Sequence, residues 1–156
     1  MGVETEAEAE VDHPVPELGP GKLKIGLDLV EVARVERLID RWGERFLERL
    51  FTPAELDYAR ARRRPGEHLA ARLAAKEALI KAWGRPLRWR EIEVATAPSG
   101  EPFFSRLPAE LASWGVRLSL SHTGGLAAAV VLLFRGKRGA PRRGAAERGS
   151  PGGARG

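Results

Sequence analysis

LAARLAAKEALIKAW, residues 69–83, is the stretch around which the rest of the chain is organised. It is rich in Ala, Leu and Ile and contains no Gly or Pro, which predicts a helix. At 100° per residue, its charged residues share one side with its large apolar residues, and the opposite side is almost all Ala. A surface helix would separate these two classes. The charged residues are Arg72, Lys76, Glu77 and Lys81.

Two interpretations of this charged side remain open. The first is an ordinary amphipathic helix in which Glu77 and Lys81 form an i,i+4 pair that contributes only a few tenths of a kcal/mol. The second is a half-buried Lys-Glu-Lys cluster, which is costly unless it meets a ligand or an ion. The second interpretation predicts a functional site on this helix.

Composition excludes several classes of protein. The 156 residues, 43% of them hydrophobic, suit one folded domain. The absence of cysteine excludes disulfides, thiol catalysis and Cys-based zinc sites. No apolar run is long enough to form a membrane-spanning helix. The first twenty residues lack the apolar core of a secretory signal, so we expect a cytoplasmic protein.

The two ends of the chain carry opposite charge. Residues 1–21 contain five Glu, one Asp and no Lys or Arg, whereas residues 135–156 contain seven Lys or Arg and one Glu. Both ends are poor in large apolar residues, so we expect both to be disordered. The folded domain is expected over residues 22–134, which keep a net charge of +5.

The first part of this domain begins with a strand and continues with helices. Residues 23–29 alternate between apolar and other side chains, which predicts a strand with Asp28 at its end. Residues 32–50 have apolar residues at helical spacing, with a break at Gly43. Residues 52–55, TPAE, form a capping box with Pro at the first helical position, so a further helix starts there. It is expected to stop at residues 65–66, Pro-Gly, before the central helix.

The second part is predicted to be mainly strands. Expected elements are a strand at 91–97, a short returning strand at 103–104, a helix at 107–114, and strands at 116–120 and 126–134 joined by a hairpin turn. Because most helices precede these antiparallel strands, the fold class is α+β, an antiparallel sheet packed against helices with a long central helix.

Three residues outside any simple pattern are candidates for chemistry. Asp28 lies at a strand-to-helix junction, Glu77 lies on the charged side of the central helix, and His122 lies at a strand end beside a Thr-Gly-Gly turn. Each has an ordinary alternative, namely a helix N-cap, a surface ion pair and a surface or core histidine. The turn itself lacks the glycine spacing of a phosphate-binding loop.

Taken together, the two carboxylates favour a hard cation. Mg²⁺ typically takes one or two protein carboxylates, keeps several waters and completes its octahedron with substrate phosphates. Positive charge for those phosphates would come from Arg72, Lys76, Lys81 and His122.

Several segments resemble the holo-[acyl-carrier-protein] synthases, single-unit members of the 4′-phosphopantetheinyl transferase superfamily. GLDLVEV at 26–32, with Arg34 beyond it, resembles the first signature of that family, and RLAAKEALIKA at 72–82 resembles the second. FTPAEL at 51–56, GEP at 100–102 and LSLSHT at 118–123 follow in the family's order and spacing. The resemblance covers about residues 22–134 and implies the 4′-phosphopantetheinyl transferase fold.

The resemblance also implies an activity and roles for residues. Such enzymes move the phosphopantetheine arm of coenzyme A onto a serine of an apo acyl carrier protein, with Mg²⁺ as the metal, and serve fatty acid biosynthesis. By position, Asp28 and Glu77 match the metal-binding carboxylates, and Lys81 joins them as a catalytic residue. The residues that match coenzyme A contacts are Arg72, Lys81, His122 and Thr123.

The family's partners complete the expectation. Arg34 matches the start of a basic helix that meets the acidic carrier protein, and Arg41 and Arg45 extend this partner-binding surface. The family arrangement, a homotrimer with sites between subunits, is expected because one unit encloses only part of a cleft. The alternative is a basic nucleic-acid-binding module that acts mainly through the Arg-rich tail, although only 6% of residues are aromatic, which is few for base stacking.

Overall fold

A computed structural model of the protein describes residues 23–135 and has the predicted α+β architecture. The expectations for residues 1–21 and, beyond Arg135, for the basic tail lie outside this range. Within 23–135, no helix is both long enough and apolar enough to cross a membrane.

The elements in chain order are β1 (Leu23–Glu31), α1 (Val32–Trp42), α2 (Glu44–Leu50), α3 (Pro53–Arg60), α4 (Pro65–Trp83), β2 (Glu93–Thr96), β3 (Pro102–Arg106), β4 (Gly115–Thr123) and β5 (Leu126–Phe134), with 3₁₀ turns η1 (Trp89–Glu91) and η2 (Ala109–Leu111).

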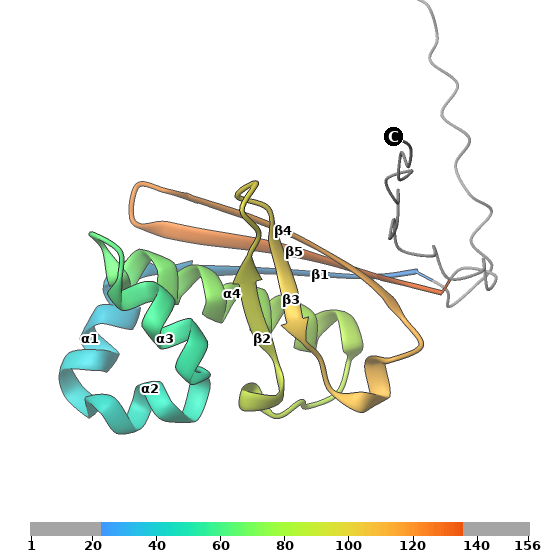
Figure 1. The fold of residues 1–156 in the computed structure, drawn as a ribbon, viewed down its shortest axis with the longest axis horizontal. Helices are drawn as coiled ribbons and strands as arrows, with labels where there is room; N and C mark the ends of the chain where they lie inside the picture. Colours follow the sequence, from blue (N-terminus) through green and yellow to red (C-terminus); the bar gives the residue numbers. More distant parts are fainter. Residues whose placement is uncertain (1–22, 136–156) are drawn as a thin grey trace, which may run out of the picture.

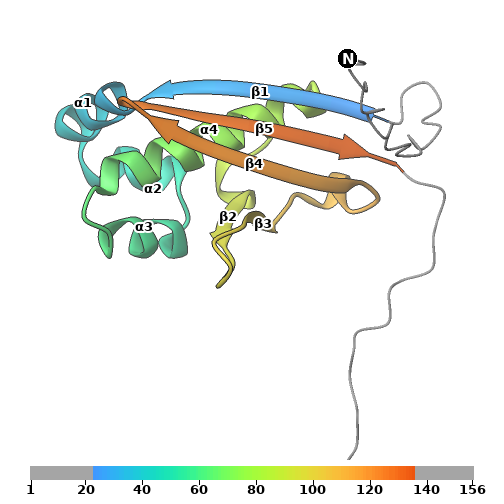
Figure 2. The same ribbon diagram turned by 90° about the horizontal axis from the view of Figure 1, so that it is seen from above.

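Two antiparallel sheets form the β part of the described structure. The larger has strand order β1-β5-β4, and β2 pairs with β3 in a separate hairpin. Figure 2 shows the three long strands side by side, with α1 at the end where β1 finishes. The β4–β5 hairpin turns through Gly124 and Gly125, both with positive φ, as their sequence predicts. The Val32 amide donates to the Gly125 carbonyl at 2.7 Å, which joins the start of α1 to this turn.

The central helix α4 lies across one face of the larger sheet (Figure 1). Its Ala side makes this packing possible, since Ala74, Ala75 and Ala78 are fully buried. On β1 the facing residue is Gly26, where a methyl carbon would overlap the carbonyl oxygen of Ala78. Ala and Gly together therefore bring the strand and the helix into backbone contact.

The alternation of β1 is inverted relative to an ordinary half-buried strand. Its buried residues are Gly26, Asp28 and Val30, which face α4. Its large apolar residues are on the other face and are exposed, namely Leu23, Ile25, Leu27 and Leu29. The strand was therefore predicted correctly by its period, although the period does not say which face is buried.

Helices α1 to α3 gather around one end of α4 (Figure 1). Gly43 separates α1 from α2 as predicted, and Thr52 and Glu55 form the expected capping box at the start of α3. Two boundaries differ from the prediction. Pro65 does not merely stop α3, because it occupies the first turn of α4. The helix expected at 107–114 is only the turn η2, since Pro108 is followed by a single 3₁₀ turn whose Leu111 is buried in the core.

Candidate active site

Asp28 lies on the buried face of β1 and not at a helix cap. The N-cap of α1 is Glu31, so the N-cap interpretation of Asp28 is wrong. Its Oδ1 accepts a hydrogen bond from the Lys81 ammonium at 2.5 Å. Its other oxygen, Oδ2, is buried and has no partner among the described residues. A buried carboxylate oxygen without a donor is costly, so this atom is a candidate ligand for a cation.

Glu77 lines the same cleft as Asp28. The cleft has a volume of about 250 Å³ and also contains Arg34, Leu50 and Trp89 in its walls. Burial, and secondarily the nearby Asp28 carboxylate, raise the pKa of Glu77. The predicted Glu77–Lys81 pair does not form, because the Lys81 ammonium bonds Asp28 and the Leu27 carbonyl instead.

The two carboxylates are a donor set that a hard cation could use. Within residues 23–135, no group of three or more His, Cys, Asp and Glu residues is arranged for a metal. A cation held by Asp28 and Glu77 would therefore need most of its ligands from water or from a substrate. This is the ligand pattern that Mg²⁺ accepts in phosphate-handling sites, and it does not resemble a structural zinc site.

Arg72 lies one and a half turns of α4 away from Glu77, in a basic and aromatic corner. Its side chain is buried, with the guanidinium carbon 3.9 Å from the centre of the Tyr58 ring. One nitrogen donates to the His68 carbonyl at 3.2 Å, whereas Nε and Nη2 are buried without a partner. The unpaired donors point to a missing acceptor, and an anionic ligand would supply one.

His122 belongs to the same corner and Thr123 does not. The His122 ring lies 6.4 Å from the ring of His68, centre to centre. Its register partner on β5 is the buried Ala127, which places His122 on the face of the sheet that α4 covers. Thr123 pairs with the exposed Leu126, so it points to the opposite face.

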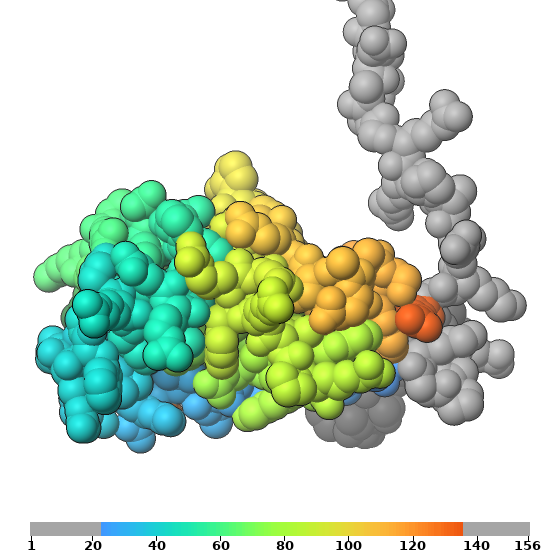
Figure 3. All heavy atoms as spheres, turned by 90° about the horizontal axis from the view of Figure 1, so that it is seen from below, coloured from blue at the N-terminus to red at the C-terminus, as the bar shows by residue number. Residues whose placement is uncertain are grey.

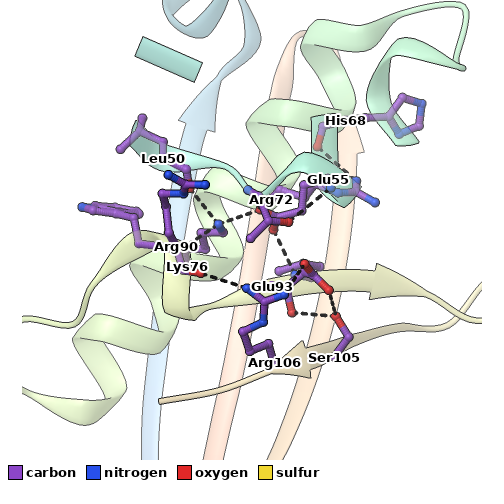
Figure 4. A network of polar contacts seen from close by, with 12 residues as sticks. Leu50, Glu55, His68, Arg72, Lys76, Arg90, Glu93, Ser105 and Arg106 are labelled. Atoms are coloured by element: carbon purple, nitrogen blue, oxygen red, sulfur yellow. Dashed lines mark hydrogen bonds and ion pairs between the residues drawn. The ribbon is translucent and has the colours of Figure 1, made fainter. Parts of the chain in front are cut away.

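Lys76 differs from its predicted role. It was expected to offer positive charge to phosphates, but its side chain is completely buried. Its ammonium already donates to three protein acceptors, as Figure 4 shows for Leu50 and Glu55. An ammonium has three N–H donors, so none remains for a ligand. The expectation that Lys76 binds phosphate is therefore wrong.

The predicted partner-binding residues lie on the outer surface. Arg34, Arg41 and Arg45 are exposed on α1 and at the start of α2. Arg34 also lines the cleft, so it links this basic surface to the two carboxylates. Arg41 lies over the ring of Trp42, 5.2 Å from its centre.

Several residues of these sites had no signal in the sequence. Tyr58 and His68 surround Arg72, and burial, followed by the charge of Arg72, lowers the pKa of His68. Trp89 forms a wall of the cleft from a turn that has no periodicity. Glu55 was recognised only as a capping residue, although the same carboxylate also accepts from Lys76. The capping motif reveals neither the burial of Glu55 nor its long-range partners Lys76 and Val94.

Comparisons with known proteins agree on one family. The model of the 4′-phosphopantetheinyl transferase superfamily matches residues 24–131. The holo-[acyl-carrier-protein] synthase of Thermus thermophilus is 49% identical over 119 residues, which cover 74% of this chain and 95% of the relative.

Solved structures agree as well. The Neisseria meningitidis holo-[acyl-carrier-protein] synthase aligns with a TM-score of 0.66 at 34% identity, over 72% of this chain and 98% of that one. The Bacillus anthracis holo-(acyl-carrier-protein) synthase, solved in complex with CoA (3′,5′-ADP), aligns with a TM-score of 0.63 at 33% identity, over 72% of this chain and 96% of that one. The chain therefore belongs to the 4′-phosphopantetheinyl transferase superfamily, among the holo-[acyl-carrier-protein] synthases.

Proposed function

We propose that the protein transfers the 4′-phosphopantetheine group of coenzyme A to a serine of an apo acyl carrier protein, releasing adenosine 3′,5′-bisphosphate. The observation that carries the proposal is the cleft in which Asp28 and Glu77 meet, with Lys81 bonded to Asp28. Family membership and the names of the relatives support this choice of reaction. The setting would be the cytoplasm and the pathway fatty acid biosynthesis.

Asp28 and Glu77 are the proposed Mg²⁺ ligands. Besides the oxygen that Lys81 bonds, Asp28 has a buried Oδ2 without a partner among the described residues, and burial raises the pKa of the neighbouring Glu77 carboxyl. When bound, Mg²⁺ supplies charge neutralisation for the pyrophosphate oxygens of coenzyme A.

The transfer does not require a covalent bond between the protein and the phosphopantetheine group. The serine oxygen attacks the phosphorus that carries the pantetheine arm, the serine proton passes to water, and the bond from that phosphorus to the bridging oxygen breaks. The leaving bisphosphate takes the electron pair. Lys81 is suited to stabilise it, because its side chain is more than half exposed and its ammonium is bonded to Asp28 beside the cleft. No protein nucleophile is needed, in agreement with a chain that has no cysteine.

The corner around Arg72 is the proposed site for the phosphates of coenzyme A. Its two unpartnered guanidinium nitrogens offer charge-assisted hydrogen bonds, and His122 faces the same side of the sheet. Thr123 points to the other face of the sheet, so it would contact coenzyme A only where a second subunit covers that face.

The basic surface of α1 and α2 is the proposed docking surface for the carrier protein. Arg34, Arg41 and Arg45 suit an acidic partner, and Arg34 adjoins the cleft where the serine must arrive. Complementary charge of this kind raises association rates and selects partners.

A homotrimer is the proposed assembly. The outer face of β1 exposes Ile25, Leu27 and Leu29, each by more than half of its surface. The paired positions on β5 are also apolar, because Leu27 is opposite Val130 and Ile25 is opposite Leu132. A continuous apolar sheet face of this kind is typical of a subunit interface.

Mass spectrometry tests the proposed reaction directly. The full chain is incubated with coenzyme A, Mg²⁺ and a purified apo carrier protein, and the carrier should gain the mass of one phosphopantetheine group. A carrier whose acceptor serine is replaced by alanine is the control and should gain nothing. No gain by the intact carrier with any divalent metal would rule out this function.

A further inference from the structure

We propose that Lys76 and Glu55 are positioning residues, whose buried pair holds in place one wall of the cleft that Glu77 also lines. The wall consists of Leu50, at the end of α2, and Trp89, at the start of η1. The inference rests on the proposed function, because it assigns this wall to the path of the carrier protein.

The Lys76 ammonium uses all three of its N–H donors inside the protein. It donates to the Leu50 carbonyl at 2.7 Å, to Glu55 Oε2 at 2.7 Å and to the Trp89 carbonyl at 3.0 Å. The two carbonyls belong to the two residues that form the wall. The Lys76 side chain thus fixes both parts of the wall to α4, the helix that also carries Glu77. Figure 4 shows its contact with Leu50.

Glu55 adds a second contact at the α2–α3 junction and extends this network to one more segment, β2. Its Oε2 also accepts from the Thr52 amide at 2.8 Å, and its Oε1 accepts from the Val94 amide at 2.9 Å. Both side chains of the pair have no exposed surface. The pair therefore joins α4, the α2–α3 junction, η1 and β2, four segments that are separate in the sequence.

The backbone hydrogen bonds of the wall are local, such as the one from the Ile92 amide to the Trp89 carbonyl at 3.3 Å. Leu50 is the last residue of α2 and Trp89 is the first residue of a single 3₁₀ turn. Figure 3 shows the end of α2, in cyan, beside the yellow-green segment that follows α4, and the two elements contact each other. Short elements of this kind open easily unless side chains fix them.

Stability alone does not account for a buried ion pair at this position. Both side chains of the pair are removed from water, and the desolvation of two charged groups is costly. Well-packed apolar residues are often as stabilising as a buried pair, whereas a charged pair with full hydrogen bonding can specify one geometry. The geometry specified here is the distance from Leu50 and Trp89 to Glu77.

Enzyme kinetics on two variants separate positioning from simple stability. Lys76→Met removes all three hydrogen bonds and leaves the buried Glu55 carboxyl without its Lys partner. Lys76→Met/Glu55→Gln also removes the carboxyl group, at the loss of one backbone hydrogen bond because a single amide oxygen replaces the two oxygens that accept from Thr52 and Val94, and the Leu50 and Trp89 carbonyls still lack the Lys76 donor. We expect KM for the carrier protein to rise about tenfold in both variants, with the Kd for coenzyme A, from calorimetry, within about twofold of wild type.

Leu111→Ala is the matched control. Leu111 is buried on η2, and its truncation should lower the urea midpoint without moving KM for the carrier. The inference is overturned if KM returns to the wild-type value in the double variant, if the control raises KM equally, or if the double variant cannot fold. The last result would show that the pair serves only to hold the protein together.

Hydrogen exchange separates failure of this inference from failure of the proposed function. If the wild-type protein transfers nothing, the proposed function fails and the exchange data decide the structural part. Peptides over residues 47–52 and 88–94 should exchange about tenfold faster in the folded double variant, with β4 and β5 unchanged. Unchanged exchange in those two peptides would overturn the positioning role.

Discussion

Gly26→Ala should destabilise the protein strongly, because Gly26 sets the approach of β1 to α4. A methyl carbon at this position would overlap the carbonyl oxygen of Ala78 and lie 2.7 Å from the amide nitrogen of Ala82. Both are backbone atoms, so no rotation of a side chain can relieve the overlap and the helix must move away from the strand. We expect a loss of about 3 kcal/mol in the free energy of unfolding, at the upper end of overpacking.

Urea unfolding, followed by circular dichroism at several protein concentrations, measures this loss. With a denaturant slope of about 1.5 kcal/mol per molar, the midpoint should fall by about 2 M. Gly115→Ala is the control, since its methyl would meet only the far edge of the Phe134 ring, which can turn aside. That variant should unfold within about 0.5 kcal/mol of wild type, helped by the lower entropy of its unfolded chain.

The reasoning is refuted if the Gly26→Ala midpoint stays within about 0.3 M of wild type. Such a result would mean that the sheet and the helix can separate freely. It would also remove the explanation for the spacing of the carboxylates, because Asp28 lies two residues from Gly26 on the same face of β1.

Four further outcomes follow from the site and its surroundings. Glu77→Gln should abolish transfer while circular dichroism stays unchanged; an unfolded variant with normal activity per folded molecule would mean that Glu77 is only structural. Arg34→Glu should raise KM for the carrier protein several-fold without changing the Kd for coenzyme A, and Arg88→Glu, outside the cleft lining, should change neither. Leu27→Glu should shift the mass measured by light scattering toward one subunit, and an unchanged mass would exclude this face as the interface. His68 has a lowered pKa, so it contributes stability above pH 6.5 that is lost as the pH falls through its folded pKa; His68→Gln should flatten that part of the urea-midpoint profile between pH 7.5 and 5.

Elements with strong local signals could be predicted from the sequence. The Ala-rich helix, the capping box at Thr52 and Glu55, the break at Gly43 and the Gly-Gly hairpin are all present. Each depends on backbone propensity or on hydrogen bonds within a few residues, so the information is local. The α+β class followed from their order along the chain.

Features that depend on packing could not be predicted in this way. The alternation of side chains in β1 predicts a strand. Which face is buried depends on α4, which packs against Gly26 and so buries the face that carries Asp28. Lys76 and Glu77 are adjacent in a charged run, yet one is saturated inside the protein and the other lines the cleft. The helix predicted at 107–114 is reduced to a single 3₁₀ turn, because one turn is enough to bury the single apolar residue Leu111.

The unusual charges of α4 follow from burial on both sides of the helix. Its Ala side packs against the sheet, and much of its other side is covered by α1, α3 and β2. Charged groups on that side must then either be paired internally, as Lys76 is with Glu55, or open into a cleft, as Glu77 does. An ordinary amphipathic helix would expose these charges to solvent. We therefore expect one Ala face, and charges placed among leucines on the other face, in a central helix that carries a functional site.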